Sequence, residues 1–261
     1  MSALELNFWV FLFICFATWL MSVITKEYSW VDRIWSIIPV VYLWIFAYGA
    51  EFSDPRLNLM AVLVTLWGAR LTYNFARKGG YAPGGEDYRW AILRDKMSPA
   101  VYQIFNIFFI VIFQNALLLA ITLPANLALN SMLEFGWIDL LLAALFLGLL
   151  VLEFVADQQQ WNFHQLKKLG KTEKGFLDKG LFAYSRHPNF FAEQAQWWVL
   201  AIWGFVVADF TKPEYFLGVV FLTALFLGSA RFTEQLSSGK YPEYKEYQKR
   251  VSMMIPWFRS K

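Results

Sequence analysis

The feature that most constrains the fold is a series of long apolar stretches along the 261-residue chain. A helix needs roughly 20 mostly apolar residues to cross the hydrocarbon core of a bilayer. Inside lipid, a helix satisfies all of its backbone N–H and C=O groups within the segment. Hydrophobic residues make up 58% of the chain and charged residues only 16%, which is outside the usual range for soluble domains. The sequence therefore predicts an all-α, polytopic membrane protein.

We expect about seven transmembrane helices. No internal repeat or linker separates them, so the sequence predicts a single membrane domain over residues 1–261, with residues from about 137 onward forming most of the ligand site. The first stretch lacks a basic start and a cleavage site, which favours a retained helix over a signal peptide. The predicted spans are Phe8–Thr25, Ile34–Ala50, Leu57–Phe75, Val101–Leu123, Trp137–Ala156, Phe190–Ala208 and Tyr215–Phe232.

The distribution of Lys and Arg predicts the orientation, because cytoplasmic loops retain basic residues. With the N-terminus outside, only Arg56 and Lys212 lie on the outer side, whereas the basic clusters within 77–96 and 167–171 lie inside. We therefore expect a cytoplasmic C-terminus and a cytoplasmic active site. The net charge of +3 is small, so the basic side favours topology and an anionic small molecule over nucleic acid.

A polar stripe follows the fifth span. The segment "VLEFVADQQQWNFHQLKKLG" has no helix breaker before Gly170, which predicts that the span continues as one long helix. Its polar residues then share one helical face, starting at membrane depth. An ionisable group at that depth faces a cavity or a partner, so the stripe is either a site or a structural contact between helices. The residues of the stripe are Glu153, Asp157, Gln160 and His164.

The segment "AYSRHPNFFAEQAQWW" predicts a helix start with unusual hydrogen-bonding capacity. Pro188 suits the first helical position, where its missing N–H costs nothing. The free N–H groups of that turn, together with Arg186 and His187, would form an anion-binding corner suited to a phosphate or pyrophosphate. Ordinary capping with retention of a basic residue on the inner side is the alternative. The polar residues that follow share one face: Asn189, Glu193 and Gln196.

Near the C-terminus, Tyr244, Tyr247 and Arg250 recur at helical spacing. They could stack on a base and clamp a phosphate, or form an aromatic belt at the membrane interface. There is no G-x-G-x-x-G or Walker motif, so a dinucleotide would be held without a Rossmann domain. With His164 and His187 as the two histidines and no H-E-x-x-H, we expect no metal site. A serine triad lacks its G-x-S-x-G elbow.

Five segments that extend over nearly the whole chain carry a resemblance to a known family: "GLFAYSRHPNFFAEQAQWW", "EFVADQQQ", "YPEYKEYQKRVSMMIP", "VDRIW" and "LWGARLTYNFAR". The chain resembles the steroid 5-alpha reductase superfamily, in particular a bacterial branch of it whose own function is unknown. The resemblance implies a seven-helix membrane enzyme that binds NADPH from the cytoplasm and reduces a carbon–carbon double bond conjugated to a ketone.

By position, the resemblance implies that Asn189 and Glu193 lie near the cofactor. The superfamily polarises the ketone with a glutamate and a tyrosine, but Asp32 and Trp67 stand in those places here. Trp is not a general acid near neutral pH. The expected catalytic residues are therefore Asp32, Arg70 and Tyr73. The residues expected to bind NADPH are Asp157, Gln160, His164, Lys167, Tyr184, Ser185, Arg186, His187, Asn189, Glu193, Arg231, Tyr244, Tyr247 and Arg250.

The leading hypothesis is an NADPH-dependent reductase that acts on a lipid or steroid-like enone. The distantly similar isoprenylcysteine carboxyl methyltransferases share an R-H-P motif, so an S-adenosylmethionine-dependent methyltransferase is the alternative. Ala192 replaces the glycine of their motif. A non-enzymatic lipid-binding protein is the third hypothesis. We expect membrane lipids as neighbours, no nucleic acid, no obligate protein partner, and a location in the bacterial inner membrane.

Overall fold

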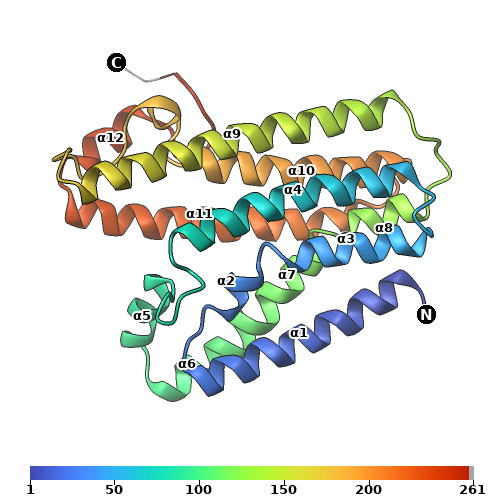
Figure 1. Ribbon diagram of the computed structural model, residues 1–261, viewed down its shortest axis with the longest axis horizontal. Coiled ribbons are helices and arrows are strands. Elements are labelled where there is room, and N and C mark those ends of the chain that lie inside the picture. The colour runs from blue at the N-terminus through green and yellow to red at the C-terminus, as the bar shows by residue number, and fades with distance from the viewer. Residues whose placement is uncertain (259–261) are drawn as a thin grey trace. The chain divides into compact units, whose positions relative to one another are not determined.

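The computed structural model describes residues 1–258 of the chain, and it is helical (Figure 1). Over these residues, one isolated bridge between Ser185 and Ser252 is the only β-type pairing. The all-α prediction is therefore confirmed. The elements are α1 (Ala3–Thr25), α2 (Trp30–Ile34), α3 (Ile38–Gly49), α4 (Pro55–Arg77), α5 (Tyr88–Asp95), α6 (Pro99–Phe105), the π-helix η1 (Asn106–Phe113), α7 (Gln114–Ala120), α8 (Pro124–Leu129), α9 (Trp137–Lys168), the 3-10 turns η2 (Gly180–Ala183) and η3 (Pro213–Phe216), α10 (Pro188–Val207), α11 (Leu217–Lys240) and α12 (Tyr244–Arg250).

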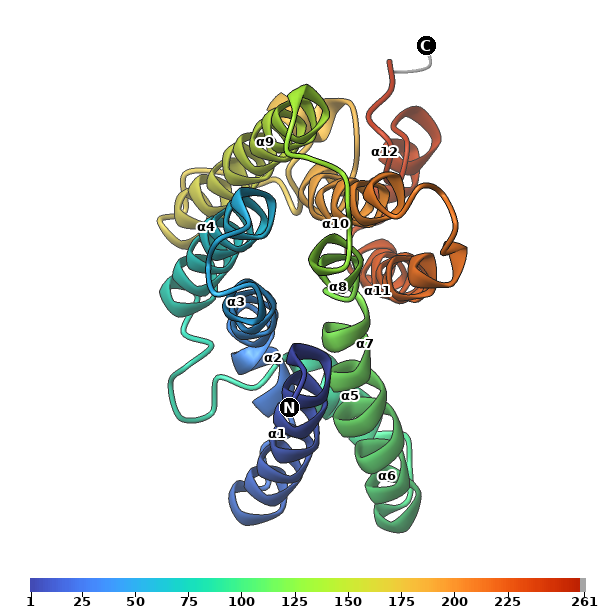
Figure 2. The same cartoon turned by 90° about the vertical axis from the view of Figure 1, so that its right-hand side faces the viewer.

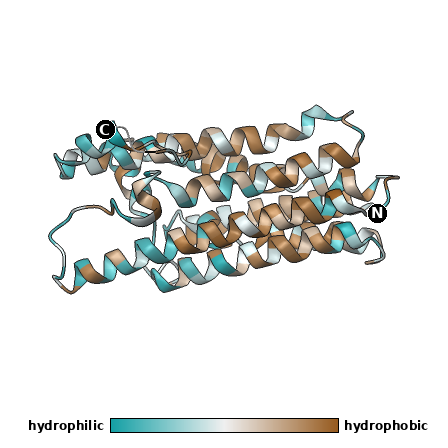
Figure 3. Ribbon diagram, turned by 90° about the horizontal axis from the view of Figure 1, so that it is seen from above, coloured by the Kyte–Doolittle hydropathy of each residue, from teal (hydrophilic) through white to brown (hydrophobic). Residues whose placement is uncertain are grey.

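Within residues 1–258, five helical segments are long and apolar enough to cross a membrane: Ala3–Thr25, Pro55–Arg77, Pro99–Leu129, Trp137–Lys168 and Pro213–Lys240. The protein is therefore a multi-pass membrane protein. The two other predicted spans correspond to α3, which has only 12 residues, and to α10, whose first half carries amide and carboxylate side chains. Figure 3 shows hydrophobic residues along the middle of the helices and hydrophilic residues near many helix ends.

Local signals place the helix boundaries. α1 begins with a capping box, in which Ser2 accepts from the backbone of Glu5 and the Glu5 carboxylate accepts from Ser2 N–H. α10 begins at Pro188, as predicted from its suitability for a first helical position. α9 continues without interruption to Lys168, which confirms the long helix expected from the absence of a breaker before Gly170.

The described chain divides into two compact units. The first comprises Met1–Ala143 and Leu200–Gly218, and the second comprises Ala144–Val199 and the chain from Val219 onward. The single domain expected over residues 1–261 stays a prediction. The expected catalytic residues Asp32, Arg70 and Tyr73 belong to the first unit, whereas all the expected cofactor residues belong to the second.

In the first unit, α1 packs against α3, η1 and α7, and α3 packs against α4 and α8 (Figure 2). A buried ion pair fastens the start of α4 to the start of α9: Arg56 Nε donates to Asp139 Oδ1 at 2.6 Å. Trp203 Nε1 donates to the same oxygen at 2.6 Å, and the Arg56 guanidinium also donates to the carbonyls of Leu133 and Glu134. The guanidinium donors of Arg56 therefore stabilise the fold.

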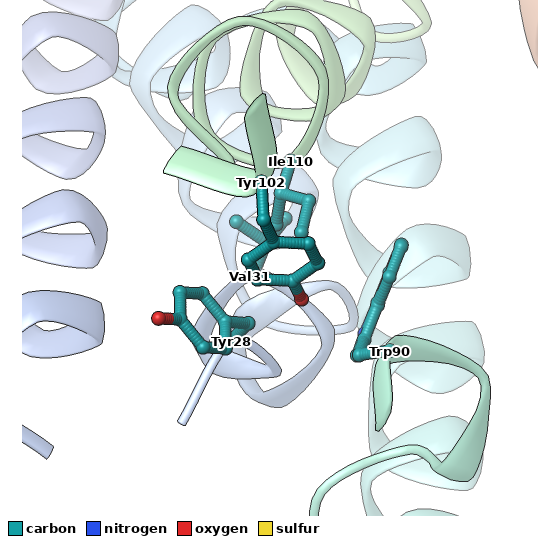
Figure 4. Packing of buried hydrophobic residues seen from close by; sticks show 5 residues of the cluster. All are labelled: Tyr28, Val31, Trp90, Tyr102 and Ile110. Atoms are coloured by element: carbon teal, nitrogen blue, oxygen red, sulfur yellow. The ribbon is translucent and has the colours of Figure 1, made fainter. Parts of the chain in front are cut away.

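An aromatic cluster packs around α2, α5 and α6 (Figure 4). The ring of Tyr28 meets that of Tyr102 edge-on, with centroids 4.7 Å apart. Trp90 lies in the same cluster, and its indole N–H donates to Asp32 Oδ2 at 2.7 Å. The cluster thereby joins the α5 segment, which follows the glycine-rich loop after α4, to α2.

Candidate functional site

The second unit brings two buried carboxylates of α9 against two amides of α10. Gln196 Nε2 donates to Glu153 Oε2 at 2.7 Å, and Asn189 Nδ2 donates to Asp157 Oδ1 at 3.4 Å. Both carboxylates are buried. The first half of the predicted stripe therefore faces another helix, as an ionisable group at membrane depth requires.

The second half of the stripe differs. Gln160 is half-buried, and His164 is exposed, with its ring edge-on to Phe163 at 5.8 Å. The polar face is thus buried at Glu153 and Asp157 and becomes exposed toward the end of α9.

Glu193 lies on the same face of α10 as Asn189 and Gln196, and it is also buried. We call these five residues, Glu153, Asp157, Asn189, Glu193 and Gln196, the polar cluster. Gln196 is fully buried, and its Oε1 receives no hydrogen bond from any residue in 1–258. A buried amide oxygen without a donor costs about 1–3 kcal/mol. The polar cluster therefore has an unused acceptor beside carboxylates, which suits a ligand that carries an N–H donor.

The predicted anion corner at the start of α10 contains an anion that belongs to the chain itself. Arg186 Nε and Nη2 donate to the two oxygens of Glu234 at 2.6 and 3.0 Å, and His187 Nε2 lies 3.1 Å from Glu234 Oε1. Gln248 Nε2 donates to Glu234 Oε2 at 2.9 Å. We call Arg186, His187, Glu234 and Gln248 the carboxylate clasp.

Arg186 has little hydrogen-bonding capacity left. A guanidinium carries five N–H donors. Two of those of Arg186 bind Glu234, and its Nη1 donates to the carbonyls of Gln248 and Val251. Its side chain is 9% exposed. Its expected contact with a phosphate stays a prediction, whereas its contacts in the structure join α10, α11 and the segment after α12.

The residues just before α10 are fastened to the C-terminal segment. Ser185 is fully buried, and its hydroxyl donates to the carbonyl of Met254 at 2.6 Å. The His187 N–H donates to the carbonyl of Met253 at 3.1 Å. The Tyr184 ring is 48% exposed, while its carbonyl accepts from Trp257 N–H. Ser185 and Tyr184 thus position the start of α10 through backbone contacts.

An aromatic pocket lies at α12. The Phe176 ring stacks on that of Tyr247 at 5.1 Å and meets Tyr244 edge-on at 4.9 Å. Tyr247 Oη donates to the carbonyl of Phe182 at 2.5 Å. The pocket has a volume of about 260 Å³, and its walls include Phe176, Tyr247, Lys174 and Arg250. Pockets for drug-sized ligands usually measure roughly 300–1,000 Å³, so this pocket suits one part of a larger ligand.

Charged groups surround this pocket. Lys174 Nζ pairs with Asp178 at 2.5 Å, and Arg250 is exposed at the rim. Lys167 Nζ donates to Tyr241 Oη at 2.7 Å and to the carbonyl of Gly175 at 3.1 Å. The Lys167 ammonium holds the pKa of the Tyr241 phenol below its usual range. Lys167 therefore anchors the loop that carries the pocket wall. Arg231, also expected to bind the cofactor, is exposed on α11.

The expected catalytic residues have different surroundings. Removal of the Asp32 carboxyl from water raises its pKa, although the Trp90 hydrogen bond opposes that rise. Arg70 is buried, whereas Tyr73 is 58% exposed, with the Arg77 guanidinium 5.3 Å from its ring centroid. Asp32 is the one carboxyl among these three residues, and its setting favours retention of a proton. No group of three or more His, Cys, Asp or Glu side chains in residues 1–258 is arranged to hold a metal ion.

Glu234 and Trp90 are the residues that the sequence analysis missed. Glu234 binds Arg186 across 48 positions, and Trp90 binds Asp32 across 58. A possible signal was the position of Glu234 just after the predicted span Tyr215–Phe232, since a carboxylate close to membrane depth requires a partner. Nothing in the spacing identifies that partner.

Comparison with known proteins places the chain in a family. Residues 18–251 match the family described as a protein of unknown function, DUF1295. An uncharacterized protein of Schizosaccharomyces pombe, C594.04c, is 38% identical over 258 residues, which cover 91% of this chain and 75% of that protein. No solved structure matches the chain. This relative is fungal, and the bacterial inner membrane stays a prediction. The match over most of its length shows that the chain belongs to the DUF1295 family.

Proposed function

We propose that this protein is a membrane-embedded, NADPH-dependent reductase that delivers hydride to a conjugated carbon–carbon double bond of a lipid or steroid-like enone. The resemblance to the steroid 5-alpha reductase superfamily suggests the reaction. The observation that carries the proposal is the polar cluster, where the buried Gln196 Oε1 accepts no hydrogen bond from residues 1–258. The nicotinamide carboxamide has N–H donors for that oxygen and a carbonyl for a neighbouring amide donor.

The residues present fit NADPH at two places. In the polar cluster, Gln196 and Asn189 would hold and orient the carboxamide, with Glu193 on the same helical face. In the aromatic pocket, the flat faces of Phe176 and Tyr247 would receive part of the nucleotide end. Arg250 would supply positive charge for its phosphates, whereas Lys174 is paired with Asp178, and the carboxylates of Glu243 and Glu246 also line the pocket.

Arg186 has a different role in this proposal from the one expected of it. Because four of its five donors are committed to Glu234 and to backbone carbonyls, Arg186 acts through the carboxylate clasp. It holds the first turn of α10 in place, and that turn presents Asn189 to the polar cluster. We therefore propose Arg186 as a positioning residue rather than a phosphate ligand.

Reduction of the double bond requires one hydride and one proton. Bound NADPH supplies the hydride, and the protein supplies orientation and polarity. Asp32 is the proposed proton donor, because its raised pKa keeps the carboxyl protonated to higher pH than an ordinary aspartate.

Thermal unfolding of the purified protein in detergent tests the proposal. NADPH at 100 times its dissociation constant should stabilise the protein by about 2.7 kcal/mol. Gln196→Leu should abolish this ligand-induced gain. Gln194→Leu is the control, because Gln194 is also a buried amide of α10 but its Oε1 accepts from Thr223, so that its open atom is the donor Nε2 and not an acceptor. Stabilisation by S-adenosylmethionine and not by NADPH would replace the reductase with a methyltransferase.

A turnover assay completes the test. Oxidation of NADPH should depend on an added enone in liposomes, and Asp32→Asn should slow turnover without loss of the NADPH-induced stabilisation. If Asp32→Asn leaves turnover unchanged, Asp32 is not the proton donor. If no enone and no lipid ketone supports NADPH oxidation by a protein that NADPH does stabilise, the substrate class is wrong.

A further inference from the structure

Buried polar side chains line one face of α1 in the first unit. Asn7, Thr18 and Ser22 are buried on this helix, although α1 is mostly apolar and largely exposed. They face α3, η1 and α7, against which α1 packs (Figure 2). Their partners on those elements include Tyr42, Asn106 and Asn115, which are also buried. We call these six residues the polar seam.

The orientation of the Asn7 and Asn106 side chains follows from their partners. Asn7 Nδ2 donates to the carbonyl of Tyr42 at 3.3 Å, and a carbonyl can only accept. Asn106 Nδ2 donates to Ser22 Oγ at 3.0 Å, and that hydroxyl uses its own proton on the carbonyl of Trp19 at 2.7 Å. In both residues the amide nitrogen is the bonded end, so the amide oxygen is directed away from that bond.

The same reasoning applies to Asn115. Its Nδ2 donates to the carbonyl of Val111 at 2.8 Å and to Thr18 Oγ1 at 3.2 Å. The Thr18 hydroxyl is already a donor to the carbonyl of Ile14 at 2.7 Å. Both amide protons of Asn115 are therefore used, and its Oδ1 is left as an acceptor.

Four buried atoms of the polar seam have no hydrogen-bond partner among residues 1–258: Oδ1 of Asn7, Asn106 and Asn115, and Oη of Tyr42. Each such atom costs about 1–3 kcal/mol, so four cost roughly 4–12 kcal/mol. The whole stability of a domain is only about 5–15 kcal/mol. Bilayer hydrocarbon cannot supply the missing bonds. Small polar molecules inside the polar seam would supply these hydrogen bonds.

A π-helix forms part of the polar seam. η1 runs from Asn106 to Phe113 and gives way to α7 at Gln114, so Asn106 is the first residue of η1 and Asn115 follows its end by two positions. A π-helix closes its hydrogen bonds over five residues instead of four, and such segments occur often at functional sites. No proline or glycine explains it, since its sequence is NIFFIVIF.

We propose that the polar seam binds ordered water molecules in the membrane interior of the first unit. Three of the four open atoms are acceptors, and a water molecule donates two hydrogen bonds. Asn7 and Ser22 are 15 positions apart on α1, which corresponds to about 22 Å of helix. A single lipid hydroxyl donates one bond at one depth and leaves the other acceptors open. Several water molecules distributed along the seam would together satisfy all four atoms.

Radiolytic labelling tests this site. Brief X-ray exposure of the intact protein in lipid nanodiscs generates hydroxyl radicals from water in place, so rings beside bound water become hydroxylated. Tyr42, which is 0% exposed, should be modified in the first exposures. Met60 is the control, because it is also 0% exposed and carries a readily oxidised sulfur, yet it is not a residue of the polar seam.

The outcomes separate water from the alternatives. Asn115→Leu should reduce the labelling of Tyr42 while the circular dichroism of the protein stays unchanged, because the variant removes an acceptor for water. Labelling of Tyr42 at or below that of Met60 in the wild-type protein would overturn the proposal. Labelling that appears only after lipid extraction would also overturn it, because a lipid would then occupy the seam.

Discussion

The carboxylate clasp predicts that Glu234→Gln strongly destabilises the protein. The substitution keeps the size of the side chain and removes its charge. Glu234 is 5% exposed and accepts from Arg186 at 2.6 and 3.0 Å and from Gln248 at 2.9 Å. A glutamine would offer one acceptor and would direct an NH₂ group toward another donor. The Arg186 guanidinium would stay buried without its counter-charge.

The magnitude follows from this burial. Removal of one partner from a buried ion pair costs about 3–5 kcal/mol, mostly because the remaining charge is uncompensated. Equilibrium unfolding in detergent with increasing denaturant measures this loss. Glu246→Gln is the control, since Glu246 is exposed and pairs with the exposed Lys249 at 2.7 Å. That variant should leave the unfolding free energy unchanged.

Two results would refute the reasoning. If Glu234→Gln unfolds at the same denaturant concentration as Glu246→Gln, the clasp does not hold the fold. If Glu234→Gln instead strengthens NADPH-induced stabilisation, the freed Arg186 binds phosphate and is not merely a positioning residue. A double-mutant cycle with Arg186→Met should give a favourable coupling energy, because the neutral pair leaves no buried charge alone.

Three further predictions follow from single contacts. Asp139→Asn should cost about 3–5 kcal/mol of unfolding free energy, because Arg56 then loses its buried counter-ion. The raised pKa of Asp32 makes its contribution to stability complete below the unfolded pKa of about 3.9, and that contribution is lost as the pH rises through the folded value. The melting temperature of the wild type should fall as the pH rises through the folded pKa of Asp32, and the melting temperature of Asp32→Asn should not show this fall. Lys167→Met should raise the pKa of Tyr241, measured by ultraviolet titration of tyrosinate, and an unchanged value would refute the contact at 2.7 Å.

Local chemistry determined much of this protein. Runs of apolar residues of bilayer length specify helices, because no water is present to satisfy an open backbone. The absence of a breaker before Gly170 predicted the full length of α9, and Pro188 predicted the start of α10. Periodicity also put Glu153 and Asp157 on one face, and both are buried. Each of these features depends on residues within a few turns of one another.

Tertiary structure decided which partners those residues meet. The sequence placed Arg186 and His187 at a helix start suited to an anion, but only the packing of α11 puts the Glu234 carboxylate there. The open acceptors of Asn106 and Asn115 depend equally on which helix covers them. Helix length and face repeat with a local period, whereas the pairing of faces depends on the packing of many side chains across long sequence separations. No short window of sequence contains that information.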